Sequence, residues 1–161
     1  MVRRIRVVGL VALPVTLVVA ATAGCAALGT QGATCVDWVM YESPADAEAD
    51  AGLVVRTTGP AASTGTVALF GVAAEVHSVD VVDVLKGSEV TAGDSLEVVS
   101  APETCTGEGP YPDGDPLDAA GPLILVLHWD ADAAAWRTIT PYQGVVPPAD
   151  DGTLPEQWPA G

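Results

Sequence analysis

Two histidines and a single lysine are the side chains of this chain with obvious potential for proton transfer near neutral pH. His77 shares the alternation of Glu75, which predicts a solvent-facing position on a strand. His128 ends an apolar strand. Lys86 stands at a turn after Leu85, without the burial that a catalytic lysine needs. The histidines do not complete a serine or cysteine triad, and G-x-S-x-G, H-E-x-x-H, C-x-x-C and phosphate-binding glycine motifs are missing. The sequence therefore predicts no catalytic residue and no cofactor.

Three carboxylates of one loop, Asp113, Asp115 and Asp118, are the best candidates for a calcium site. An EF-hand loop would need a ligand where Leu117 stands and a glutamate where Ile124 stands. We therefore expect a solvated turn and no metal site.

The first 24 residues have the parts of a secretion signal in their usual order. Three arginines precede an apolar run over 7–20, and the small residues Thr22-Ala23-Gly24 precede Cys25. The stretch resembles the lipobox of bacterial lipoproteins, which is cut in front of the cysteine. The resemblance implies that Cys25 becomes the first residue and carries lipid, such as palmitate, on the outer face of the cell membrane. The composition, rich in Ala, Gly, Val, Asp and Pro, is typical of high-GC bacteria, and the resemblance implies a Gram-positive one.

Two alternatives for this leader stay open. An uncleaved membrane anchor needs about 20 apolar residues, and the run over 7–23 is slightly short and contains Pro14. A secretion signal cut without lipidation is also consistent with Ala21-Thr22-Ala23.

The odd number of cysteines fits lipidation of Cys25, because Cys35 and Cys105 then remain as a pair. Outside the membrane such a pair usually forms a disulfide. Closing so long a loop would stabilise the fold by roughly 4 kcal/mol. A metal site would need further ligands, and only the two histidines could supply nitrogen.

Without the leader, the chain carries three basic residues against 21 acidic ones, a formal charge of −18. Such a charge repels nucleic acid and anionic lipid, so acyl chains must hold the protein at the membrane. The carboxylates are dispersed, which is typical of a solvated surface.

The remaining pattern predicts a mainly β domain. A short helix should begin at Pro44, with Ser43 as its N-cap, and end near Asp50. We expect Cys35–Tyr41 to be a short strand or an extended segment and 61–65 to be a loop. A parity switch predicts a β-bulge near Val81-Val82. Strands are predicted over 53–58, within a β-rich run at 66–85, and over 95–100, 123–127 and 136–140.

These elements suit an all-β fold, a small OB-like barrel with one short N-terminal helix. The segments 49–55, 79–87, 93–98, 125–127 and 143–145 resemble bacterial surface proteins whose barrel is related to the tissue inhibitors of metalloproteinases. Those inhibitors reach a catalytic zinc with a free N-terminal cysteine. Cys25 would be lipidated instead, which argues against the same chemistry. We expect a signal peptide over 1–24, a lipidated tether over 25–34, the barrel over 35–146 and a Pro-rich tail over 147–161.

The four tryptophans divide into two pairs. We expect Trp38 and Trp136 in the core, whereas Trp129 and Trp158, near loop ends, could be core or interface. The expected function is a membrane-anchored, non-catalytic binding module for an envelope or exported protein. A small-ligand or metal-binding lipoprotein, or an enzyme with an unrecognised site, are the alternatives.

Overall fold

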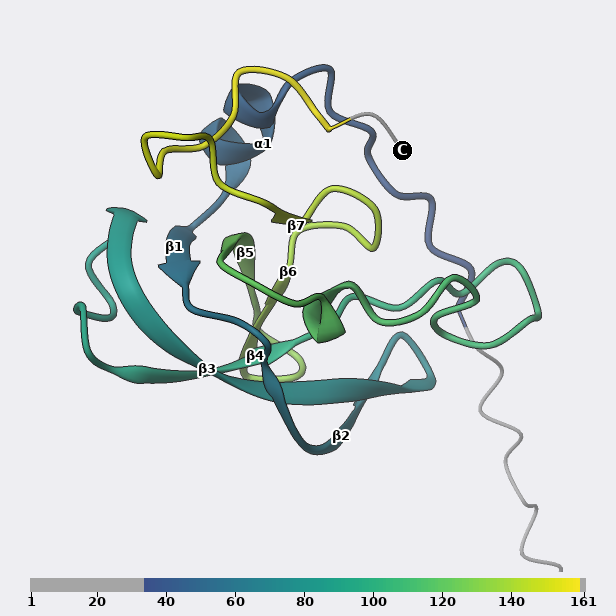
Figure 1. Cartoon of the computed structure of the whole chain (residues 1–161). Helices are drawn as coiled ribbons and strands as arrows, with labels where there is room; N and C mark the ends of the chain where they lie inside the picture. Colours follow the sequence, from purple (N-terminus) through teal and green to yellow (C-terminus); the bar gives the residue numbers. More distant parts are fainter. Residues whose placement is uncertain (1–33, 160–161) are drawn as a thin grey trace, which may run out of the picture. The chain divides into compact units, whose positions relative to one another are not determined.

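The computed structural model describes residues 34–159, which form a mostly β domain with one α-helix, α1 (Pro44–Asp50), and a 3-10 helix, η1 (Pro116–Asp118) (Figure 1). No helix within this range is long and apolar enough to span a bilayer. The seven strands are β1 (Leu53–Thr57), β2 (Ala62–Leu69), β3 (Val72–Lys86), β4 (Ser95–Val99), β5 (Leu123–Asp130), β6 (Ala135–Thr138) and β7 (Val145–Val146).

Five strands close into a barrel in the order β1-β3-β4-β6-β5, because β5 also pairs with β1. All neighbouring pairs are antiparallel except β4–β6, which is parallel. The predicted OB-like barrel is therefore confirmed.

The β-rich run predicted over 66–85 is two strands, not one. Phe70 and Gly71 both have positive φ (53° and 82°) and join β2 to β3 in a two-residue hairpin turn. The predicted loop over 61–65 is wrong from Ala62 onward, because β2 begins there. The small residues of this stretch are compatible with either a loop or a strand, and hydrogen bonding to β3 makes it a strand.

The predicted bulge near Val81-Val82 is confirmed. Along β1, Arg56 faces Asp83 and Thr57 faces Val81, so Val82 is an extra residue on β3. A second irregularity follows between Val84 and Lys86. Val81 and Val84 can thus both turn toward the barrel core, although their spacing breaks the alternation.

The domain has a core inside the barrel and a second core outside it. Alternate residues of β5, Leu123, Leu125 and Leu127, fill the barrel, and Ile124 and Val126 pack under α1 and the tail. This strand is buried on both faces, as its unbroken apolar sequence predicts. In the tail, Leu154 and Trp158 pack against the outer core.

Helix α1 has the predicted bounds and cap. The Ser43 side chain accepts a hydrogen bond from the Asp46 amide, and the Asp46 carboxylate accepts one from the Ser43 amide. At the other end, Lys86 from β3 donates to the carbonyls of Glu48 and Ala49. A cation at the negative end of the helix stabilises it.

Candidate functional site

The predicted disulfide between Cys35 and Cys105 is present, with an S–S distance of 2.03 Å. It ties the first described residues to the long loop after β4, and both cysteines are exposed. Cys25, the predicted lipid attachment site, lies outside the described residues.

The segment from Val36 to Tyr41 is anchored at both ends. The Val36 amide donates to Thr104 Oγ1 over 2.9 Å, beside the disulfide. The Tyr41 amide donates to Gln143 Oε1 over 2.7 Å, and its carbonyl accepts from Gln143 Nε2 and Trp158 Nε1. Between these anchors the segment runs along one side of the barrel towards α1 (Figure 1).

Trp38 packs on the outside of the barrel, so the expectation that it fills the core is wrong. Its ring meets Phe70 edge-on, with 5.5 Å between centroids, and the guanidinium of Arg137 lies 5.3 Å from its centre. The two anchors hold the segment from Val36 to Tyr41 against the outer face of the sheet, so the Trp38 ring cannot reach the barrel core. Its Nε1 is buried and has no hydrogen-bond partner among the described residues.

Arg137 lies on β6 directly opposite His128 of β5, and both face outward. Its side chain is 13% exposed and forms an ion pair with Asp130, which is 12% exposed, over 3.3 Å. It also donates to the carbonyls of Thr138 and Ile139. Burial lowers the pKa of Arg137, while the contact with Asp130 opposes that shift.

These side chains line a groove of about 350 Å³, which we call the Trp38 groove. Burial and the nearby carboxylate of Asp50 raise the pKa of Tyr41 in its wall. Aromatic walls, a few converging polar groups and shifted pKa values are typical of a binding site. The groove is lined by Val36, Asp37, Trp38, Val39, Tyr41, Asp50, His128, Arg137, Ile139 and Thr140.

A second hollow adjoins the groove on the α1 side and shares Val39, Tyr41 and Asp50 with it. Val39 and Met40 are 59% and 62% exposed, so they form an apolar ridge beside both. The lining of the two hollows also includes four carboxylates, which we call the acidic rim: Asp37, Glu42, Asp46 and Asp50.

His77 is buried, at 1% exposed, so the prediction that it faces solvent is wrong. It shares the alternation of Val79 and Val81, which point into the barrel. Glu75, on which the prediction was based, is itself only partly exposed, and its amide donates a hydrogen bond to the Tyr111 hydroxyl. The inward-facing row of β3 therefore begins at His77, one inward position earlier than the sequence predicts.

His77 Nε2 lies 3.0 Å from Asp115 Oδ2, and Asp115 Oδ1 accepts from Ser100 Oγ and the Leu117 amide. The carboxylate stands between the serine and the histidine, so the imidazole cannot take the serine proton directly. Ser100 and His77 are also closed to solvent. These hydrogen bonds join β3, the end of β4 and η1. Asp115 is therefore a structural residue and does not belong to a solvated turn.

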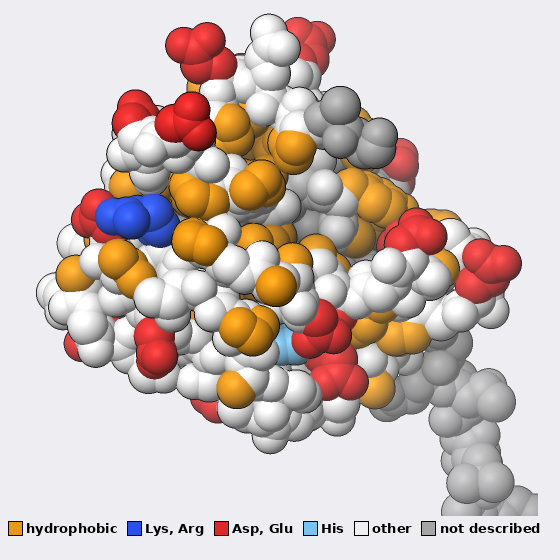
Figure 2. Space-filling view, viewed as in Figure 1, with side chains coloured by type: hydrophobic (Ala, Val, Ile, Leu, Met, Phe, Trp, Pro, Cys, Tyr) orange, Lys and Arg blue, Asp and Glu red, His pale blue; other side chains and the backbone are white. Residues whose placement is uncertain are grey.

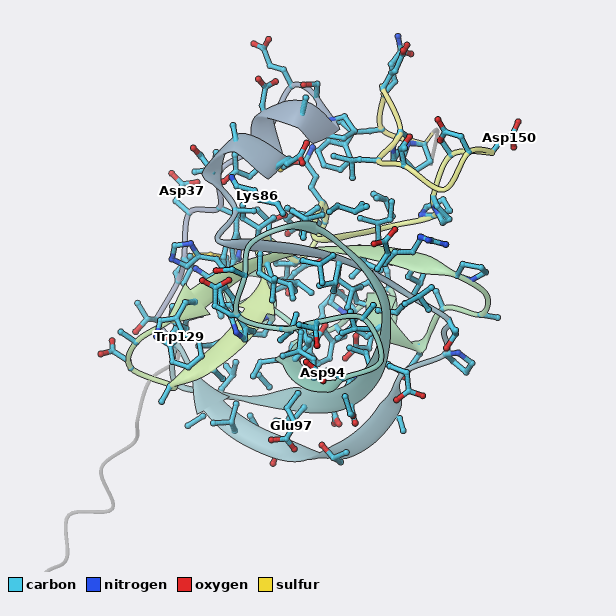
Figure 3. All side chains as sticks on the ribbon, turned by 90° about the vertical axis from the view of Figure 1, so that its left-hand side faces the viewer. Asp37, Lys86, Asp94, Glu97, Trp129 and Asp150 are labelled. Carbon is cyan, nitrogen blue, oxygen red and sulfur yellow. A yellow bond between two sulfur atoms is a disulfide. The ribbon has the colours of Figure 1, made fainter. Side chains whose placement is uncertain are left out.

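The remaining candidates are dispersed. His128 is exposed in the Trp38 groove, and Lys86 lies just below α1 (Figure 3). Trp136 packs against the barrel core as predicted and meets Trp129, 47% exposed, edge-on at 5.4 Å.

All three basic side chains of residues 34–159 are engaged within the domain. Arg56 pairs with Asp83 over 3.2 Å, Arg137 pairs with Asp130, and Lys86 caps α1. On the face in Figure 2, red carboxylates are scattered and there is a single blue patch. Asp37 and Asp150 lie at opposite edges of the view in Figure 3, above Asp94 and Glu97. The carboxylates are therefore spread over the domain.

The sequence did not indicate the Trp38 groove, because its residues come from 36–41, the end of α1, β5, β6 and the turn that follows. Only the alternation within Cys35–Tyr41 indicated an extended segment there. Comparison with protein-family models, with curated proteins and with solved structures finds no match for this chain.

Proposed function

We propose that this protein is a lipid-anchored, extracytoplasmic binding module that docks a basic face of an envelope or exported protein in the Trp38 groove. The single observation that carries the proposal is the gathering of Trp38, Tyr41 and Arg137 beside the exposed ridge of Val39 and Met40. Tryptophan, tyrosine and arginine are the residue types that dominate the energetics of protein interfaces.

The anatomy of this surface supports a protein partner. An interface usually has an apolar, aromatic centre and a polar rim. Here the ridge and the groove supply the centre, and the acidic rim supplies four carboxylates. Because the domain's three basic side chains are engaged internally, a partner with lysines or arginines around an apolar anchor matches it best.

Anchoring at Cys25 would favour such docking. Cys35 follows Cys25 by ten positions, a span of at most about 35 Å when fully extended. The domain would therefore stay close to the membrane surface, where its effective concentration towards other envelope proteins is high.

The test is cross-linking of the tagged full chain in its own envelope, with wild type, Met40→Ser and Val82→Ser compared. Val82 is also an exposed apolar residue, at 38%, but it lies on β3 outside the groove. We expect Met40→Ser to weaken capture of a defined partner several-fold and Val82→Ser to leave it unchanged. Equal capture by all three chains would refute the site.

Charge is tested separately with Asp37→Asn in the rim and Glu97→Gln on β4. Affinity for the purified partner should fall with added salt. Asp37→Asn should lower this affinity more than Glu97→Gln does, and its affinity should fall less steeply with salt than that of wild type. Affinity that rises with salt would contradict a basic partner.

A small-molecule ligand is the second candidate, favoured by the 350 Å³ volume and the convergence of Arg137, His128 and Tyr41. In that case a low-molecular-mass extract of the envelope, but not its proteins, would perturb the NMR signals of these residues.

A further inference from the structure

Strand β2 lies beside the barrel and has one neighbour. Within residues 34–159 it pairs with β3 alone, while β3 continues into the barrel through β4 and β1 (Figure 1). Of the eight residues from Ala62 to Leu69, six are exposed, and the other two, Val67 and Leu69, pack with the hairpin tip. The second edge of β2 is therefore open within this range.

The hairpin register identifies the backbone groups on that open edge. Leu69 and Val72 flank a two-residue turn, so they form the closing hydrogen-bonded pair, and Val67 with Ala74 forms the next. Ala68 faces Ala73 between these pairs, and Thr66 faces Glu75 just beyond them, so both are non-hydrogen-bonded positions. The amide of Glu75 donates to Tyr111 and its carbonyl accepts from Ser100, away from β2. The amides and carbonyls of Thr66 and Ala68 must then point outward.

This edge lacks the usual protection against pairing. Proteins shield exposed edge strands with charged side chains, prolines, bulges or a covering element. The stretch from Ala62 to Leu69 contains no charged residue and no proline, and its one bulge, at Thr64, leaves the run from Gly65 to Leu69 regular.

The distribution of charge indicates which molecule pairs with the open edge of β2. The chain has a net charge of −15, so two copies repel one another over most of their surfaces. A basic partner, in contrast, gains nothing at a strand without charge. β2 is a strand at which two copies can approach backbone to backbone without apposing carboxylates from the paired strands.

We propose that two copies of this chain associate through antiparallel pairing of their β2 strands over Gly65–Leu69. The contact is two-fold symmetric and closes after one pairing, so it produces a dimer and not a fibre. It does not depend on the Trp38 groove or on lipidation. Because repulsion opposes it, salt strengthens the dimer, which is opposite to the salt effect on a basic partner.

The first test measures the mass of the full mature chain by sedimentation equilibrium at low and high salt. We expect a monomer–dimer equilibrium whose Kd falls at least several-fold between about 0.05 and 0.5 M salt. A chain that remains monomeric at millimolar concentration and high salt overturns the proposal, whether β2 is left open or is covered by the chain's own N-terminal residues.

Hydrogen exchange tests the register. The Val67 and Leu69 amides should be protected at every concentration, whereas those of Thr66 and Ala68 should become protected as the dimer forms. A dimer that leaves Thr66 and Ala68 exchanging freely would use another surface.

Two variants separate pairing from folding. Ala68→Pro removes an outward amide and no bond to β3, and Thr66→Asp places a carboxylate on the edge without changing the backbone. Each should weaken the dimer at least tenfold while the circular dichroism spectrum stays that of wild type. Ala92→Asp adds the same charge in the exposed turn before β4 and should leave the dimer within about twofold. Thr66→Asp that dimerises like Ala92→Asp would refute the pairing.

Discussion

The guanidinium of Arg137 lies over two aromatic rings at once, 5.3 Å from the centre of Trp38 and 5.7 Å from that of Phe70. It also pairs with Asp130, so one side chain joins β6, the β5–β6 hairpin, the β2–β3 turn and the N-terminal segment. The wall of the Trp38 groove therefore depends on a cation that the domain itself supplies.

Arg137→Ala should destabilise the domain by about 3 kcal/mol, because it leaves the largely buried Asp130 without its partner and removes the packing under Trp38. The measurement is denaturant unfolding. The matched control is Arg56→Ala, whose ion pair with Asp83 is more exposed, and we expect a cost of about 0–1 kcal/mol. Equal costs would mean that the aromatic contacts contribute little.

The Asp115 carboxylate holds the loop after β4 against the barrel. Asp115→Ala removes its contacts with His77, Ser100 and the Leu117 amide and should cost about 3 kcal/mol or more. Asp118→Ala, at the exposed end of the same 3-10 helix, should stay within about 0.5 kcal/mol of wild type.

Removal of the His77 imidazole tests whether the buried hydrogen bonds among His77, Asp115 and Ser100 take part in function. His77→Ala should lower stability but leave the affinity of the folded protein for its partner within a few-fold, since His77 does not line the Trp38 groove. Lys86→Ala should also leave affinity within a few-fold, because Lys86 does not line the groove. His128→Ala removes a side chain that does line it and should weaken affinity without abolishing it. Abolished function in a folded variant would favour the enzyme alternative.

Tyr111 should make the domain sensitive to alkali. Burial raises the pKa of Tyr111 to about 12, while its hydrogen bond from the Glu75 amide opposes the shift. The folded state thus holds the phenol proton more tightly than the unfolded state, whose pKa is about 10. This contribution is complete below pH 10 and is lost as pH rises from about 10 to 12.

The check is the free energy of unfolding between pH 9 and pH 12 in wild type and Tyr111→Phe. The variant should be less stable at pH 9, because it loses the hydrogen bonds to Ser100 and Glu75, and should show a shallower decline above pH 10. Parallel declines in the two proteins would contradict the assignment.

Local signals in the sequence predicted much of the fold. Ser43 and Pro44 mark the start of α1, the unbroken apolar run marks β5, and the parity switch locates the bulge at Val82. Each of these features depends on residues that are close together in the chain. The disulfide followed from a count of cysteines, not from geometry.

Long-range features could not be predicted in this way. Phe70 is not a residue type typical of turns, so the sequence did not indicate the hairpin between β2 and β3. His77 is inward because Asp115, 38 residues later, meets it. The Trp38 groove exists only after the barrel brings residues 36–41 against β5 and β6.

Lipid attachment at Cys25 is tested by fractionation of cells. Cys25→Ser should leave an unprocessed precursor or release the chain from the membrane, whereas Cys105→Ser should remain membrane-bound. A shortened Cys25→Ser chain that still sediments with membranes would contradict lipidation.

The disulfide should contribute both to stability and to the shape of the groove. It closes a loop of 70 residues, so the double variant Cys35→Ser, Cys105→Ser should lose about 4 kcal/mol in the chain-entropy model. Thiol labelling of the unfolded, unreduced mature protein should find no free thiol.

The groove should be affected more strongly than the barrel in this double variant. The bond lies one residue before Val36, at the end of the segment that carries Trp38, whereas the barrel core contains neither cysteine. We therefore expect the buried indole N–H of Trp38 to exchange at least tenfold faster with solvent, while the amides of β5 keep their order of protection. Met40→Ser in the intact protein is the control, because it alters the ridge and leaves the anchors in place. An unchanged exchange rate at Trp38 would mean that the hydrogen bonds at Val36 and Tyr41 hold the groove without the disulfide.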